Sequence, residues 1–96
     1  MESVATGVTV LLPGVLRTRA GGASAVHAAG TTVAELIASL EEQHPGLRFN
    51  LCYETGELRP FVNIFVDGQN IRYLRGLATP IHAGARVHIL PSVAGG

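Results

Sequence analysis

The sequence has no lysine and no tryptophan, a single cysteine and a formal net charge of zero. Because positive charge is not in excess, the chain lacks the basic surface that neutralises nucleic-acid phosphates, and we expect no nucleic-acid partner. The one cysteine, Cys52, cannot close a disulfide within the chain and has no CxxC neighbour for metal or redox chemistry. We therefore expect Cys52 to pack as a small, half-buried hydrophobe.

Long apolar segments are also missing. No run of the sequence approaches the ~20 apolar residues that cross a membrane as a helix. The N-terminus carries neither a basic segment followed by an apolar run nor a lipidation motif. These observations predict a cytoplasmic protein with no membrane partner. The lack of lysine also leaves no acceptor within the chain for an isopeptide bond or a Schiff base.

The residues that are present suffice for one folded domain. The chain has 96 residues, of which 47% are hydrophobic and 15% are charged, and such a composition can offset the entropy of ordering the chain. This length accommodates one core and leaves no room for a second. All seven basic residues are arginines.

Period-two alternation and turn signals predict the strands and their connections. The expected strands are residues 8–12, 23–28, 61–66, 69–73 and 86–90. Asp67-Gly68 separates the third strand from the fourth and is suited to a tight type I′ turn. The remaining segments have neither period and are expected to be connections, the second with one short helical turn: residues 13–22, 47–60 and 74–84.

One amphipathic helix is expected between the two hairpins. Thr32 and Glu35 form a capping box, in which each side chain can satisfy a free backbone amide at the start of the helix. Pro45-Gly46 ends it. The apolar face of the helix, at spacing i, i+3, i+4 and i+7, consists of Val33, Leu36, Ile37 and Leu40.

The order of hairpin, helix, hairpin and strand predicts an α+β fold. A single amphipathic helix cannot bury its apolar face alone, so it must pack on one face of a sheet. This order matches the β-grasp arrangement with a mixed sheet. Periodicity alone also allows a four-stranded or a ferredoxin-like arrangement.

The last five residues differ in character from the rest. Ser92-Val93-Ala94-Gly95-Gly96 are small and uncharged and directly follow the last expected strand. We expect residues 1–91 to form the domain and residues 92–96 to form a flexible tail. Because glycine has no Cβ atom, a terminal Gly-Gly pair can thread a narrow channel of another enzyme, and the carboxylate of Gly96 would then be the reactive group.

Three segments carry a family resemblance. The strand and turn FVNIFVDG (61–68), the connection GLATP (76–80) and the ending VHILPSVAGG (87–96) resemble the ubiquitin-like sulfur carriers of the MoaD and ThiS type. They look most like the CysO branch, which serves cysteine biosynthesis. The resemblance extends over nearly the whole chain and implies a β-grasp fold.

The resemblance also implies a function and a set of partners. An E1-like enzyme would use ATP to adenylate the carboxylate of Gly96, and sulfur would then replace the adenylate to give a thiocarboxylate. Residues Ser92, Val93, Ala94 and Gly95 would lie in the channel of the partner. A pyridoxal-phosphate-dependent cysteine synthase would receive the sulfur, and a zinc metallopeptidase would release the cysteine. The chain would thus be a carrier and not an enzyme, and ATP and pyridoxal phosphate would belong to its partners.

Two groups of residues are candidates for contacts with those partners. Arg17 and Arg19 in the first connection, with Arg72 and Arg75 near the second hairpin, are candidates for docking an acidic surface of the activating enzyme. Val93 is a candidate apolar anchor of the bound tail.

The histidines do not suggest a further site. They lie in four separate segments and lack the spacing of a zinc site, so no metal site is expected. His88 alternates with Val87 and Ile89 and is expected on the opposite face of the last strand.

Other functions remain open on the sequence. The same residues would serve the small subunit of a molybdopterin synthase, or a sulfur carrier for thiamine or a secondary metabolite. A protein modifier would use the same terminus, and a plain interaction domain would carry the two glycines as an inert ending. Neighbouring genes would separate the pathways, and covalent adducts in cell extracts would reveal a modifier.

Overall fold

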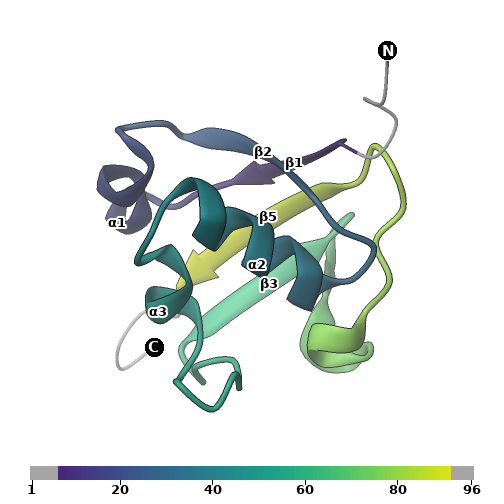
Figure 1. Cartoon of the computed structure of the whole chain (residues 1–96). Helices are drawn as coiled ribbons and strands as arrows, with labels where there is room; N and C mark the ends of the chain where they lie inside the picture. The colour runs from purple at the N-terminus through teal and green to yellow at the C-terminus, as the bar shows by residue number, and fades with distance from the viewer. Residues whose placement is uncertain (1–6, 92–96) are drawn as a thin grey trace.

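Five strands form one mixed sheet in the order β2-β1-β5-β3-β4, with α2 lying across one face (Figure 1). The structure is a computed structural model that describes residues 7–91. The strands are β1 (Gly7–Leu11), β2 (Ala25–Ala29), β3 (Val62–Val66), β4 (Gln69–Asn70) and β5 (Arg86–Pro91). The α-helices are α1 (Gly14–Arg17), α2 (Val33–Gln43) and α3 (Leu47–Leu51), and the 3-10 helices are η2 (Thr18–Ala20), η3 (Ile71–Tyr73) and η4 (Gly76–Ala78).

The pairing of the strands places β5 in the middle of the sheet. β1 and β2 form an antiparallel hairpin, β1 runs parallel to β5, and β3 is antiparallel to both β5 and β4. Two hairpins joined by a helix, with the last strand inserted between them, make up the β-grasp arrangement. The predicted α+β fold is therefore confirmed, and the four-stranded and ferredoxin-like alternatives are excluded.

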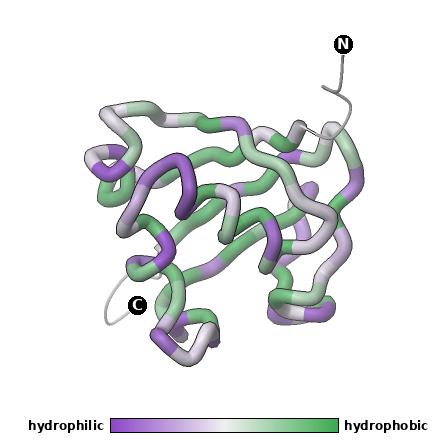
Figure 2. The backbone as a smooth tube through the Cα atoms, viewed as in Figure 1, coloured by the Kyte–Doolittle hydropathy of each residue, from purple (hydrophilic) through white to green (hydrophobic). Residues whose placement is uncertain are grey.

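The core lies between α2 and the covered face of the sheet. Val10 of β1 and Val87 of β5 are paired and fully buried, because alternate residues of each strand face the helix. The predicted apolar face of α2 is confirmed, since each of its four residues is at most 3% exposed. Figure 2 shows the central strands mostly hydrophobic, whereas most hydrophilic stretches lie on connections and outer helix turns.

The start of α2 is capped, with one difference from the prediction. The Thr32 hydroxyl accepts a hydrogen bond from the backbone N–H of Glu35 at 3.2 Å, as expected for the cap. The Glu35 carboxylate reaches one residue further back than a capping box requires, and it accepts hydrogen bonds from the backbone N–H and the hydroxyl of Thr31, both at 2.8 Å. These bonds lower the pKa of Glu35.

The turn between β3 and β4 follows the sequence signal. Asp67 and Gly68 have φ values of +50° and +87°, and a type I′ turn requires positive φ at both central residues. The predicted turn is confirmed. Asp67 is the one residue other than glycine with positive φ among residues 7–91.

Two segments depart from the prediction. Residues 13–22, expected to be a loop, contain α1 and η2, and Leu16 and Ala20 of these short helices pack into the core. The predicted edge strand 69–73 is wrong beyond Asn70, because the chain turns into η3 there. The Asn70 side chain accepts a hydrogen bond from the backbone N–H of Arg72, and Ile71 becomes completely buried.

The connection from α2 to β3 contains α3, the short helical turn expected there. Cys52 follows α3 and pairs with Leu58 through an isolated antiparallel bridge. Within residues 7–91, no helix combines the length and the hydropathy needed to span a membrane.

Candidate functional site

The site predicted from the sequence begins where β5 ends. Pro91 is the last described residue, and it pairs with Val62 at the start of β3. The five residues predicted to enter a partner, Ser92 to Gly96, lie outside the described residues. The structure therefore shows the end of the sheet from which they continue, and we call this end the tail base.

An apolar groove of about 110 Å³ opens at the tail base. Val62 and Ile89 form part of it from the sheet, and Asn50 lines it from α3. Val15 of α1 and Phe61, just before β3, also line the groove, although their side chains are 71% and 50% exposed. Two large apolar side chains therefore stand in solvent beside the start of the tail.

In the α3 segment an arginine contacts two aromatic rings. The Cζ atom of Arg59 lies 4.7 Å from the ring centroids of both Phe49 and Tyr53, within the range of cation–π attraction. The Arg59 Nε group also donates a hydrogen bond to the Phe49 carbonyl oxygen at 2.8 Å. Because Nε is held by a backbone oxygen, the guanidinium plane has a defined orientation.

Two of the four candidate docking arginines lie at the tail base. Arg17 Nε donates a hydrogen bond to the Leu12 carbonyl oxygen at 3.1 Å, just after the end of β1. Arg72 Nη2 donates to the carbonyl oxygens of Arg59 and Pro60 at 2.9 and 3.1 Å, and to that of Val62. Since β5 lies between β1 and β3, these two arginines lie on opposite sides of its end. Both donate side-chain hydrogen bonds to backbone carbonyl oxygens.

The other two candidates lie elsewhere. The Arg19 guanidinium reaches across to the α2–α3 connection, since a Cβ atom added at Gly46 would lie 3.2 Å from its Nη1. Arg75 lies between η3 and η4, and its backbone N–H donates to the hydroxyl of the buried Thr79. The four arginines thus do not form one contiguous face.

The histidines are not gathered at the tail base. His88 is exposed while its neighbours Val87 and Ile89 are buried, so the predicted orientation is confirmed. No group of three metal-ligating side chains occurs within residues 7–91.

His82 and Asp67 form an ion pair at the β3–β4 turn. His82 Nε2 lies 2.7 Å from Asp67 Oδ2, and His82 Nδ1 lies 2.9 Å from the Ala83 carbonyl oxygen. Because both ring nitrogens face acceptors, the Ala83 carbonyl and then the Asp67 carboxylate raise the pKa of His82. The backbone N–H of Arg86, followed by His82, lowers the pKa of Asp67.

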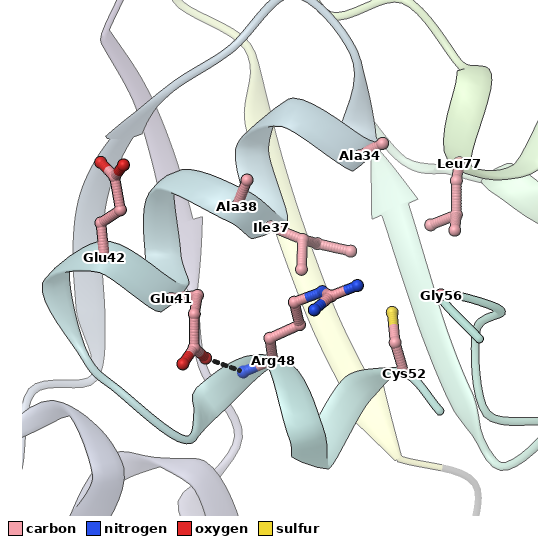
Figure 3. A pocket seen from close by; sticks show the side chains of 9 residues that line it. All are labelled: Ala34, Ile37, Ala38, Glu41, Glu42, Arg48, Cys52, Gly56 and Leu77. Carbon is pink, nitrogen blue, oxygen red and sulfur yellow. Dashed lines mark hydrogen bonds between the residues drawn. The ribbon is translucent and has the colours of Figure 1, made fainter. Parts of the chain in front are cut away.

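A second hollow, of about 500 Å³, lies on the helical side of the molecule and includes the thiol of Cys52 (Figure 3). The Glu41 carboxylate accepts a hydrogen bond from the backbone N–H of Arg48 there, at 2.9 Å. Cys52 is 3% exposed, deeper than the half-buried position expected. Burial raises the pKa of its thiol against the opposing effect of Arg48 and Arg59. Such a thiol is a poor nucleophile, and within residues 7–91 no histidine or carboxylate is hydrogen-bonded to it.

The aromatic and aliphatic side chains at the tail base and in the adjoining α3 segment were not predicted from the sequence. They are Val15, Phe49, Tyr53 and Phe61, together with Arg59. Three of the five stand in a segment without periodicity. The spacing of four between Phe49 and Tyr53 was the one available signal, because residues so spaced share a helix face.

Comparison with known proteins agrees with the fold and the ending. The profile of the ThiS family matches residues 10–96, and so includes Gly95 and Gly96. The sulfur carrier protein CysO of Mycobacterium tuberculosis is 43% identical over 91 residues, covering 93% of this chain and 98% of that protein. Its crystal structure has a TM-score of 0.86 at 41% identity, covering 90% of this chain and 99% of that chain.

Two further relatives bear on partners and on chemistry. A chain of the crystal structure of the Amycolatopsis orientalis BexX/CysO complex has a TM-score of 0.87 at 40% identity, covering 93% of this chain and 99% of that chain. Small archaeal modifier protein 3 of Haloferax volcanii is 40% identical over 65 residues, covering 68% of this chain and 70% of that protein. With the family profile matched over most of its length and the β-grasp sheet in place, the chain belongs to the ThiS family of ubiquitin-like sulfur carriers.

Proposed function

We propose that the chain carries sulfur on the carboxylate of Gly96 for cysteine biosynthesis. The observation that carries the proposal is that the family match runs through Gly95 and Gly96 in a chain 43% identical to a CysO sulfur carrier. In this proposal the chain supplies the acyl group, and its partners supply the catalysis.

The chemistry has two steps. A carboxylate is a poor electrophile, because its oxygen is a poor leaving group until it is activated. An oxygen of Gly96 attacks the α-phosphorus of ATP and displaces pyrophosphate. Hydrosulfide supplied by the sulfur donor then attacks the acyl carbon and displaces AMP with release of one proton, which leaves a thiocarboxylate on Gly96, whose sulfur is nucleophilic.

The fold supports this division of labour. β5 is hydrogen-bonded on both sides, to β1 and β3, so the start of the tail is held by the centre of the sheet. Five residues beyond Pro91 can extend at most roughly 18 Å at 3.3–3.6 Å per residue. The carboxylate can therefore reach into an enzyme whose surface meets the tail base.

The proposed partners are an E1-like adenylating enzyme, a pyridoxal-phosphate-dependent cysteine synthase and a zinc metallopeptidase. A complex of BexX with CysO is known for Amycolatopsis orientalis, which supports an enzyme partner for carriers of this type. Arg17 and Arg72, on either side of the end of β5, are the proposed central contacts to an acidic surface of the activating enzyme, and Arg19 and Arg75, which lie apart from them, are proposed as outer contacts. Reversing the charges of Arg19 and Arg75 together should weaken adenylation at low salt, and unchanged kinetics would contradict their role.

Adenylation can be tested separately from sulfur transfer. Incubation with an E1-like enzyme and labelled pyrophosphate should give pyrophosphate exchange into ATP that depends on the chain. A variant lacking Gly96 should support none, and Cys52→Ser should support normal exchange because the thiol has no part in the step. Equal exchange with and without Gly96 would contradict the proposal.

A protein-modifying role is the second candidate, favoured by the 40% identity to Small archaeal modifier protein 3. In that case the activated Gly96 would form an amide with a lysine of another protein. Expression of a tagged chain should then give higher-mass adducts in cell extracts, and these adducts should vanish when Gly96 is removed.

A further inference from the structure

We propose that Arg59 and the exposed rings of Phe49, Tyr53 and Phe61 form a docking anchor that receives an acidic side chain of the enzyme acting on Gly96. We call these four residues the Arg59 anchor. The inference rests on the function proposed above, and it deepens that function by naming where the partner binds and what chemistry its contact has.

Exposed apolar side chains are concentrated at the tail base and in the adjoining α3 segment. Seven large apolar residues are exposed within residues 7–91: Val15, Phe49, Tyr53, Phe61, Tyr73, Leu74 and Leu90. Val15 and Phe61 line the groove at the tail base, and Leu90 precedes Pro91 on β5. Phe49 precedes Asn50 and Leu51, the α3 residues of that groove, and it lines a separate hollow together with Tyr53. Three of the seven therefore lie at the tail base and two lie in the adjoining α3 segment, and exposed apolar residues grouped in this way mark protein interfaces.

The Arg59 side chain is held in place by hydrogen bonds and ring contacts. Its backbone N–H donates to the Leu51 carbonyl oxygen at 2.9 Å, and its Nε donates to the Phe49 carbonyl oxygen. The two rings hold the guanidinium at 4.7 Å. A side chain ordered in this way loses little conformational entropy when it binds a ligand.

The charge of Arg59 is available to a partner. Within the part of the chain that the structure describes, the only ion pair joins His82 and Asp67, so Arg59 makes no ion pair with a carboxylate of residues 7–91. Its Nη groups therefore keep donors for a carboxylate, which an arginine can bind in bidentate geometry. Arg72 bonds the carbonyl oxygen of Arg59 and adds positive charge nearby. An aspartate or glutamate within an apolar rim of the partner is the complementary surface, because the surrounding rings exclude water from the pair.

Arg59 variants test the anchor in the adenylation reaction of the full chain. Rates of pyrophosphate release, measured over a range of carrier concentrations, give KM and kcat for the wild type, Arg59→Gln and Arg59→Glu. The control is Arg86→Gln, because Arg86 is exposed at the opposite end of β5 and lies outside the tail base. Thermal unfolding of each variant establishes that it is folded at the assay temperature.

The anchor predicts an effect on KM that depends on charge. Removal of a buried interface arginine typically costs about 2 kcal/mol, and 1.4 kcal/mol is tenfold, so Arg59→Gln should raise KM about 10- to 30-fold with kcat changed less than about twofold. Arg59→Glu should raise KM further, and its KM should fall as salt is added because salt screens the new repulsion. Arg86→Gln should match the wild type.

Each other outcome is distinguishable. Equal KM increases for Arg59→Gln and Arg59→Glu without salt dependence would assign Arg59 a structural role and overturn the anchor. Wild-type KM in both variants would also overturn it and would leave the carrier function intact. A wild-type chain that releases no pyrophosphate would contradict the carrier function and the anchor with it.

Discussion

Replacing Gly30 by alanine should destabilise the fold by bringing a side chain against the backbone of α2. A Cβ atom at this position would lie 2.7 Å from the Leu36 nitrogen and 3.0 Å from the Glu35 carbonyl carbon. Both are helix backbone atoms, and Leu36 is 1% exposed, so neither can swing aside. Overpacking of this kind costs about 1–3 kcal/mol, and the lower conformational entropy of the unfolded alanine chain offsets about 0.4–1 kcal/mol of that cost.

The net loss should therefore be about 1–2 kcal/mol, measured as a lower urea midpoint with an unchanged m-value. For a domain of this size it corresponds to a fall in Tm of roughly 4–16 °C. Gly14→Ala is the matched control, because a Cβ there meets no atom within 4 Å and Gly14 has no positive φ. It should leave stability unchanged or raise it by up to about 1 kcal/mol. Equal midpoints for Gly30→Ala and the wild type would refute the reasoning.

Three further predictions concern local contacts. Asp67→Asn should lower the NMR titration midpoint of His82, because Asp67 raises the pKa of that ring. The ion pair stabilises the fold fully between about pH 4 and pH 6.5. This contribution is lost as pH rises through the folded pKa of His82 or falls through that of Asp67. Cys52 should react slowly with a thiol reagent in the native protein and rapidly in urea, because burial raises its pKa, and rapid native labelling would contradict its burial. Thr32→Ala should cost about 1 kcal/mol in urea unfolding through loss of the α2 cap, and Thr32→Ser should restore most of that loss.

The elements predicted best from the sequence are those whose signal is local. Thr32 and Glu35 mark the start of α2 because both groups of the cap lie within one helical turn. Asp67-Gly68 marks its turn because the φ values needed there are disfavoured for most residues. The strand at 86–90 alternates in burial as its sequence does.

The elements predicted poorly depend on distant contacts. Residues 71–73 have an apolar pattern compatible with a strand, but Ile71 is needed in the core, and Arg72 binds carbonyl oxygens that precede β3. The chain therefore leaves the sheet edge. Leu16 and Ala20 likewise form helical turns because the core accepts them, although their segment has no helical period.

One part of the candidate site could likewise be predicted from the sequence and another part could not. Gly96 could be singled out because a terminal Gly-Gly is visible in the sequence and is shared with a family. The Arg59 anchor could not be singled out, because Arg59 and Phe49 are ten residues apart in a segment without helical or strand periodicity. Only the folded connection between α3 and β3 brings the guanidinium to the rings.

The most direct test of the carrier function is the intact mass of the chain after incubation with an E1-like adenylating enzyme, ATP and a sulfur source. The account predicts a mass increase equal to the exchange of one oxygen for one sulfur in the wild type and in Cys52→Ser, and none in a variant lacking Gly96. An unchanged wild-type mass, with an enzyme that loads another carrier of the ThiS family under the same conditions, would contradict it.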